Sequence, residues 1–190
     1  MNSASLPLHS AKAEFRALVA VVMGSDSDLE TLQPAIEILQ EFELKVQVRI
    51  LSAHRTPLEM VNFAQGAEAK GLKVIIAGAG GAAHLPGMIA SLTSIPVIGV
   101  PIPSKYLSGI DSMHSILQMP GGIPVATVAI GGGLNAGLLA AQILGTTNTT
   151  IKEKVSTYRK SLHDQVIIKD EKLVELGTNE YLKAKREADI

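Results

Sequence analysis

The sequence contains no cysteine and no tryptophan, and only 3% of its residues are aromatic. Without cysteine, a disulfide framework, a thiolate metal site and a cysteine nucleophile are all excluded. Charged residues make up 18% of the 190 residues, less than the ~25% that is typical of globular domains, and the net charge is −1. A chain without an excess of basic residues is poorly suited to a polyanion, so we expect no nucleic-acid partner.

Charge is almost absent from residues 74–144, where Lys105 and Asp111 are the only charged side chains. The same stretch holds 12 of the 17 glycines. A lone chain of this size would expose much of the stretch as apolar surface, so we interpret it as core plus the interface of a homo-oligomer. A membrane-spanning segment is the alternative for residues 122–144. Pro124 and three consecutive glycines interrupt that segment, which favours a strand, a turn and a helix.

The length fits a single folded domain with extensions at both ends. We expect an N-terminal extension over residues 1–17, an α/β catalytic domain over 18–146, and a C-terminal helix with a polar tail over 147–190. Residues 1–16 contain no apolar run of signal-peptide length. We therefore expect a cytoplasmic protein that does not insert into a membrane.

Apolar runs alternate with amphipathic stretches along most of the chain. Such alternation with short connections predicts a three-layer αβα fold, with a doubly wound parallel sheet of the flavodoxin-like type and a C-terminal helical extension. Ser27 with Glu30, and Thr56 with Glu59, have the spacing of capping boxes at two helix starts. The expected strands cover residues 18–23, 46–51, 74–77, 96–100 and 123–129, and the expected helices include 32–42, 84–92, 111–118, 134–144 and 151–166.

Three unusual turns, at residues 24–28, 52–56 and 78–84, follow expected strands. Ligands bind beyond the carboxyl ends of the strands in such sheets, so we expect the three turns to form one site. In the first turn, Ser25 suits an anion at a helix start and Asp28 suits the hydroxyls of a ribose. The alternative is that Ser27 and Asp28 only cap the helix.

The second turn brings together Ser52, His54 and Arg55. Arginine binds phosphate through two parallel hydrogen bonds, and histidine exchanges a proton near neutral pH. A purely structural histidine is the alternative.

The third turn fits the pattern G-x-G-x-x-A of dinucleotide sites, but no acidic residue lies between residues 74 and 110, which disfavours NAD. Its glycines allow close backbone approach to a planar ring or a carboxylate, unless they serve packing only.

Other chemistries lack their sequence patterns. No nucleophile elbow and no phosphate-binding P-loop occur, and the five histidines are too far apart in sequence for a typical zinc site. What remains is a small phosphorylated substrate and proton transfer, with no cofactor and no metal.

Four motifs carry a resemblance to a known family: M-G-S-D-S-D at 23–28, S-A-H-R-T-P at 52–57, A-G-A-G-G-A-A-H-L-P-G at 77–87 and Q-M-P-G-G-I-P-V at 118–125. Together they resemble the N5-carboxyaminoimidazole ribonucleotide mutases, the class I phosphoribosylaminoimidazole carboxylase catalytic subunits. The resemblance covers about two-thirds of the chain, from residue 19 to residue 144.

The related enzymes that carboxylate aminoimidazole ribonucleotide directly with CO2 typically have Lys-Gly in place of Arg55-Thr56 and lack the A-A-H-L-P-G run. Both differences indicate the mutase class. The turn at residues 131–136 is shorter than its counterpart in much of the family and lacks a lysine.

The resemblance implies an isomerase of de novo purine biosynthesis. Such an enzyme moves the carboxylate of its ribonucleotide substrate from the exocyclic nitrogen to a ring carbon, by decarboxylation and recarboxylation with the CO2 retained. The resemblance also implies a homo-octamer without cofactor or metal. Two alternatives stay open: direct carboxylation of aminoimidazole ribonucleotide, and a nucleotide-binding regulatory module without activity.

The resemblance gives His54 the role of general acid and base. The other expected site residues bind the substrate, and they come from all three turns: Ser25, Ser27, Asp28, Ser52, Arg55, Gly80, Gly81, Ala82, His84 and Leu85.

Overall fold

The computed structural model describes residues 17–188. The expected N-terminal extension, apart from Ala17, lies outside the described residues. The chain divides into two compact units, residues 1–140 and 141–190, and each is described by itself. The division falls six residues before the expected domain boundary at residue 146, inside a helix that spans Gly133–Gly145.

The first unit is built on a five-stranded parallel sheet with the strand order β2-β1-β3-β4-β5. This order is the flavodoxin-like one, so the expected fold class is confirmed. The three central strands are buried almost throughout, which explains their continuous apolar sequences. Strand β2 lies at one edge and is largely exposed. The strands are β1 (Val19–Met23), β2 (Val46–Ile50), β3 (Val74–Gly80), β4 (Val97–Ile102) and β5 (Ala126–Thr127).

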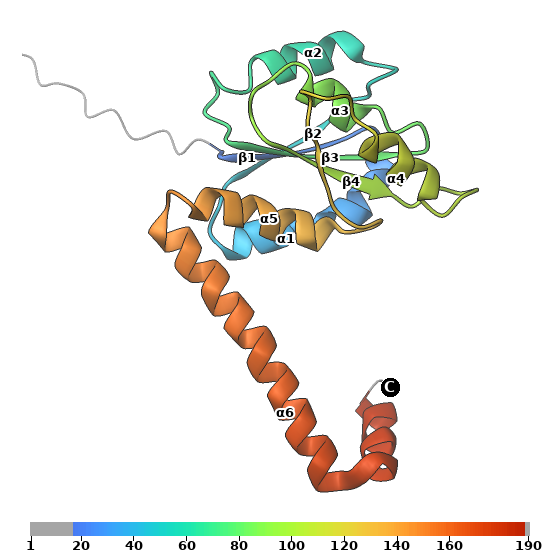
Figure 1. The fold of residues 1–190 in the computed structure, drawn as a ribbon, viewed down its shortest axis with the longest axis vertical. Coiled ribbons are helices and arrows are strands. Elements are labelled where there is room, and N and C mark those ends of the chain that lie inside the picture. Colours follow the sequence, from blue (N-terminus) through green and yellow to red (C-terminus); the bar gives the residue numbers. More distant parts are fainter. Residues whose placement is uncertain (1–16, 189–190) are drawn as a thin grey trace, which may run out of the picture. The chain divides into compact units, whose positions relative to one another are not determined.

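Helices cover both faces of this sheet (Figure 1). Helices α2, α3 and α4 lie over one face, and α1 with the start of α5 lies over the other. Met60 and Phe63 of α2 and Ile89 of α3 are buried in one cluster with Ile75 of β3. The helices of this unit are the short 3₁₀ helix η1 (Asp26–Asp28), α1 (Leu29–Glu41), α2 (Pro57–Gln65), α3 (Leu85–Ala90), α4 (Ile110–Leu117) and the start of α5 (Gly133–Gly145).

Several local expectations are corrected. Strand β3 continues to Gly80, three residues beyond the expected end, because it pairs with β4 over its last residues. Strand β5 is only two residues long, although a run of seven was expected. The two expected capping boxes are wrong. Asp28 accepts a hydrogen bond from the backbone N–H of Ser25 (3.1 Å), and the hydroxyl of Thr56 accepts from the backbone N–H of Ser52 (2.9 Å).

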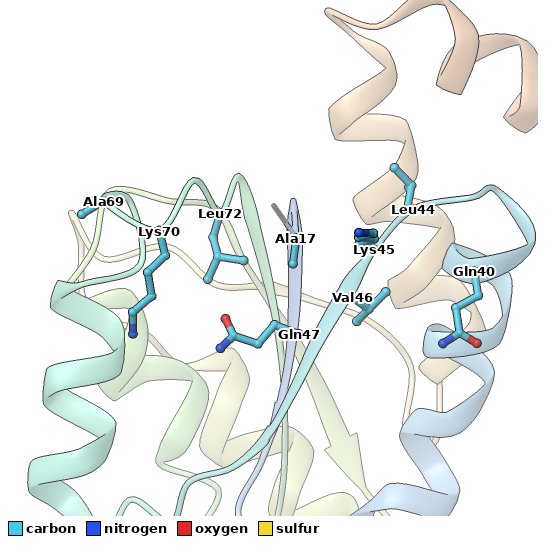
Figure 2. Close-up of a pocket in the computed structure, with 9 residues that line it drawn as sticks. All are labelled: Ala17, Gln40, Leu44, Lys45, Val46, Gln47, Ala69, Lys70 and Leu72. Atoms are coloured by element: carbon cyan, nitrogen blue, oxygen red, sulfur yellow. The ribbon is translucent and has the colours of Figure 1, made fainter. Parts of the chain in front are cut away.

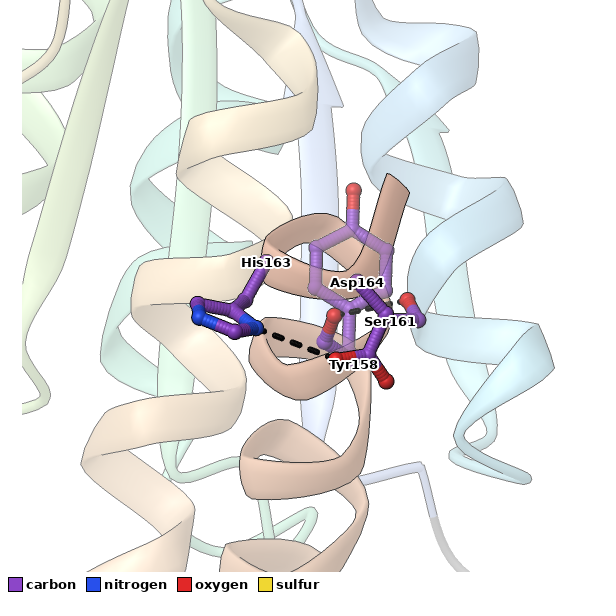
Figure 3. A network of polar contacts seen from close by, with 4 residues as sticks. All are labelled: Tyr158, Ser161, His163 and Asp164. Carbon is purple, nitrogen blue, oxygen red and sulfur yellow. Dashed lines mark hydrogen bonds and ion pairs between the residues drawn. The ribbon is translucent and has the colours of Figure 1, made fainter. Parts of the chain in front are cut away.

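The second unit consists of the end of α5 and helix α6 (Thr149–Ala188). Helix α6 has 40 residues and continues far beyond the expected end at residue 166, with a non-helical backbone at Gly177. Local polar contacts line its surface: His163 Nδ1 lies 3.0 Å from Asp164 Oδ1, and the Ser161 hydroxyl donates to the Tyr158 carbonyl (Figure 3). No helix within residues 17–188 is long and apolar enough to cross a membrane.

Candidate active site

The three turns line one pocket of about 370 Å³ at the carboxyl ends of β1, β2 and β3. All of the expected site residues except Ser27 and Gly81 contribute to its wall. The complete lining is Gly24, Ser25, Asp28, Ser52, Ala53, His54, Arg55, Ala79, Gly80, Ala82, His84 and Leu85.

Two histidines from different turns meet at this pocket. His54 Nε2 lies 2.7 Å from His84 Nδ1, and the rings are nearly perpendicular, with centroids 4.9 Å apart. One nitrogen of the pair donates a hydrogen and the other accepts it, so the tautomer of each ring depends on its neighbour. Both rings remain exposed, so the pair is accessible to a ligand. The arrangement suits exchange of a proton with a bound molecule.

Arg55 connects the first two turns. Its guanidinium donates to the carbonyl of Gly24 (2.9 Å), and its backbone N–H donates to the hydroxyl of Ser52 (3.2 Å). The guanidinium is exposed at the pocket and has five donors in all, so donors remain for an anionic ligand. Arg55 therefore serves two purposes in this geometry, because it fixes the turns and presents positive charge.

Asp28 is the one acidic side chain in the pocket wall, and it is only 8% exposed. Burial raises the pKa of its carboxyl group, and hydrogen bonds from the backbone of Ser25 and Gly24 oppose that rise, as does the charge of Arg55. Ser27 contributes a weak contact to the same carboxylate at 3.5 Å and is not part of the pocket wall. Asp28 thus presents an acceptor that suits ligand hydroxyls.

The glycine-rich turn closes a third side of the pocket. Gly81 has φ +66°, a left-handed conformation that favours glycine. The N–H of Ala83 then donates to the Gly81 carbonyl, and the N–H of His84 donates to the Ala82 carbonyl, both at 2.9 Å. These two bonds carry the chain into α3, with His84 at the helix start.

The sequence interpretation missed three lining residues, Gly24, Ala53 and Ala79. Each lies within or beside a quoted motif and contributes backbone or a methyl group, so no side-chain chemistry drew attention to it. Within residues 17–188, no three histidine or acidic side chains come together as metal ligands would.

A second hollow, of about 800 Å³, lies in the same unit (Figure 2). It is located at the amino ends of β1, β2 and β3, and its lining includes Ala17, Val46 and Leu72. Lys45 and Lys70 are its charged side chains, and it contains neither histidine nor acidic groups. Since ligands of such sheets bind at the carboxyl ends, we assign the chemistry to the smaller pocket.

A sequence model described as AIR carboxylase matches residues 18–165, which is most of the chain. This chain belongs to the AIR carboxylase family. The match includes all three turns of the pocket.

Individual members of the AIR carboxylase family are also similar. An N5-carboxyaminoimidazole ribonucleotide mutase from Synechocystis sp. is 59% identical over 165 residues, which cover 87% of this chain and 94% of that protein. A protein of the same name from Thermotoga maritima is 53% identical over 88% of this chain and 98% of its own length. The crystal structure of Treponema denticola PurE superposes with a TM-score of 0.76 at 33% identity, covering 83% of this chain and 99% of that chain.

Proposed function

We infer that this chain is an N5-carboxyaminoimidazole ribonucleotide mutase, an isomerase of purine biosynthesis. The family match gives the protein family, and the mutase names of relatives that share more than half of their residues with this chain support that reaction over direct carboxylation. The observation that carries the inference within the molecule is the pocket itself. The pocket brings together the pair of histidines suited to proton exchange, the guanidinium of Arg55 and the carboxyl group of Asp28.

The residues that line the pocket suit the separate parts of a ribonucleotide. Arg55 supplies guanidinium donors for the phosphate, and Asp28 supplies an acceptor for ribose hydroxyls. The Ser25 hydroxyl donates to Asp26 Oδ1 at 3.0 Å, and it turns from there toward the phosphate when the ligand binds. Gly80, Ala82 and the two histidines remain for the imidazole ring and its carboxylate. Backbone without bulky side chains allows a planar ring to approach closely.

We propose that His54 moves one proton twice. The carbamate C–N bond breaks, CO2 is released into the pocket, and the exocyclic nitrogen takes a proton from His54. The ring carbon then attacks CO2, forms the new C–C bond, and returns its proton to His54. The charge of His54 is therefore unchanged after one turnover, and no external proton or carbon source is required. Retaining the CO2 in the pocket preserves its effective concentration.

A direct experiment tests this function. The protein is incubated with N5-carboxyaminoimidazole ribonucleotide, without ATP and without added bicarbonate, and the product is identified by mass spectrometry and absorbance. We expect 4-carboxyaminoimidazole ribonucleotide. Product formation that requires bicarbonate and starts from aminoimidazole ribonucleotide would instead establish direct carboxylation. Ligand binding without turnover would indicate a regulatory module.

We further propose that the protein works in the cytoplasm and, as the resemblance implies, as a homo-octamer. Support comes from large apolar side chains that a single chain leaves exposed, among them Ile110, Leu117 and Leu134 in the charge-poor stretch. Burying such side chains between subunits is favourable.

A further inference from the structure

Two serines of α4 hold the backbone of Gly81, a residue that lies between pocket-lining Gly80 and Ala82 without lining the pocket itself. The N–H of Gly81 donates to Ser112 Oγ at 2.9 Å, and the hydroxyl of Ser115 donates to the Gly81 carbonyl at 3.1 Å. Both polar groups of one turn residue are therefore held by side chains that lie 31 and 34 residues further along the chain.

Of these two hydrogen bonds, the one to Ser112 is the better fixed in position. Ser112 is fully buried, and its own hydrogen goes to the carbonyl of Ile102 at 2.7 Å. Ile102 is the last residue of β4 and pairs with Gly80 of β3, so Ser112 links the turn to the end of the sheet. Ser115 has a single hydroxyl hydrogen and a second acceptor, the Asp111 carbonyl at 2.9 Å, which divides its interaction with Gly81.

Fixing Gly81 determines the direction of the next amide. In a trans peptide the carbonyl of one residue and the N–H of the next point to opposite sides. Because the Gly81 carbonyl faces Ser115, the N–H of Ala82 is directed away from that side chain. This N–H makes no hydrogen bond within residues 17–188, and Ala82 lines the pocket. It is therefore a donor available to a bound ligand.

The same turn sets the position of His84. The Gly81 carbonyl accepts from Ala83, and the Ala82 carbonyl accepts from His84, so the peptide orientation at Gly81 extends to the residue that contacts His54. Glycine in a left-handed conformation has little steric restraint of its own. The orientation must therefore be supplied by neighbouring groups, and Ser112 and Ser115 are the side chains that supply it.

We propose that Ser112, assisted by Ser115, is a positioning residue of the active site, which orients the Ala82 N–H toward the carboxylate of the bound ligand and keeps His84 beside His54. The nature of that ligand rests on the proposed function, whereas the restraint on Gly81 does not. The rival explanation is that the buried hydroxyl of Ser112 only stabilises the packing of α4, in which case every ligand should be affected equally.

The test compares full-length Ser112→Ala with the wild type in three measurements. The first is hydrogen exchange at the Gly81 amide, which should accelerate about tenfold or more. The second is kcat, which should fall about tenfold, the scale of one lost hydrogen bond. The third is the ratio of affinities for 4-carboxyaminoimidazole ribonucleotide and for aminoimidazole ribonucleotide, which lacks the carboxylate. The ratio should fall because the carboxylated ligand loses more.

Three further variants complete the design. Ser115→Ala should change the same quantities in the same direction but less. Ser112→Thr retains the hydroxyl and should recover the slow exchange of Gly81. Ser91→Ala is the matched control, because its hydroxyl donates to the Met88 carbonyl outside the pocket, and it should leave kcat and the affinity ratio unchanged.

Two outcomes would overturn the proposal. One is a folded Ser112→Ala with kcat and the affinity ratio within about twofold of the wild type. The other is an equal loss of affinity for both ligands, which would make Ser112 a stability residue only. If the wild type itself does not interconvert the ribonucleotides, the proposed function fails, while exchange at Gly81 still decides whether Ser112 restrains the turn.

Discussion

At the scale of single residues, the pocket depends on partners that lie far apart in sequence. His54 and Arg55 are adjacent in the chain, yet His54 contacts His84 and Arg55 contacts Gly24. The first contact carries the proposed proton exchange, and the second joins two turns around a positive charge. His54 and Arg55 therefore contribute to different properties of the pocket, and single substitutions can distinguish these contributions.

We predict that His54→Asn lowers kcat ~100-fold or more, the usual scale of general acid–base catalysis. Affinity for the ribonucleotide should stay within about tenfold, because the phosphate and ribose contacts remain. Steady-state kinetics and calorimetry give the two quantities. His114→Asn is the matched control, since His114 is exposed on α4 and does not line the pocket. Near-normal turnover of His54→Asn would remove this residue from the mechanism.

Arg55→Ala should weaken binding of the ribonucleotide about 10- to 100-fold, because a hydrogen bond to a charged group is lost. Binding of the corresponding nucleoside, which lacks the phosphate, should change far less. Calorimetry with both ligands measures the difference. Arg49→Ala removes an exposed arginine of β2 outside the pocket and should leave both affinities unchanged. Equal losses for nucleotide and nucleoside would contradict the phosphate assignment.

The raised pKa of Asp28 predicts that the stability of the folded protein depends on pH. Its pKa is raised in the folded state by burial, so its ionisation costs stability as the pH rises through the interval between the unfolded and folded pKa values. The stability of Asp28→Asn relative to the wild type should therefore increase as the pH rises from 3 to 7. The variant should also bind the ribonucleotide less tightly. Thermal unfolding at several pH values measures the gain.

Asp111→Asn is the control of opposite sign. A hydrogen bond from the Ser104 hydroxyl lowers the pKa of Asp111, so the ionised carboxylate stabilises the fold above the unfolded pKa. This variant should lose stability relative to the wild type over the same pH range. A common direction for both variants would refute the electrostatic explanation.

At the scale of elements, the start of α5 packs closely against α1. A Cβ atom on Gly133 would lie 2.1 Å from the carbonyl oxygen of Thr31 in α1, nearer than any real contact allows. The start of α5 and the backbone of α1 are therefore in direct contact. This contact explains a glycine at a helix start, where the sequence pattern suggested only a turn.

We predict that Gly133→Ala destabilises the protein by about 1–3 kcal/mol, the usual cost of overpacking. Denaturant-induced unfolding measures the change. Gly121→Ala is the matched control, because a Cβ atom there meets nothing within 4 Å, and it should be neutral. An equally stable Gly133→Ala would mean that α1 and α5 separate at little cost.

At the scale of the whole molecule, α6 offers an apolar stripe that its own unit leaves exposed. Leu162, Val166, Leu173 and Leu176 recur at intervals of four, seven and three residues, so they share one side of the helix. A long helix with such a stripe gains stability by burying it against another subunit. The stripe therefore supports the proposed octamer.

We predict that the wild type sediments as eight chains of 20.0 kDa, and that Leu162→Glu combined with Val166→Glu shifts it to smaller species. Charges buried at an interface without a partner are costly, which explains the direction. Sedimentation velocity measures the assembly. Lys160→Glu places a similar charge on the opposite side of α6 and should leave the octamer intact. An unchanged mass for the double variant would exclude the stripe from the interface.

The flavodoxin-like sheet and the three turns of the pocket follow from sequence patterns alone. Buried parallel strands require continuous apolar runs, and the turns at their carboxyl ends share one edge of the sheet for topological reasons. The motifs at those turns also predicted the family correctly. The substrate-binding roles of individual residues such as Ser25 and Leu85 remain predictions of the same motifs.

Contacts between individual groups, by contrast, follow from how the elements pack. His54 contacts His84, and Ser112 accepts a hydrogen bond from Gly81, although these partners lie 30 and 31 positions apart. The burial that raises the pKa of Asp28 likewise depends on the packing around it. The length of α6 and the end of β3 also differ from the sequence expectation. These features depend on distances and burial, which arise from packing between elements and leave no periodic trace in the sequence.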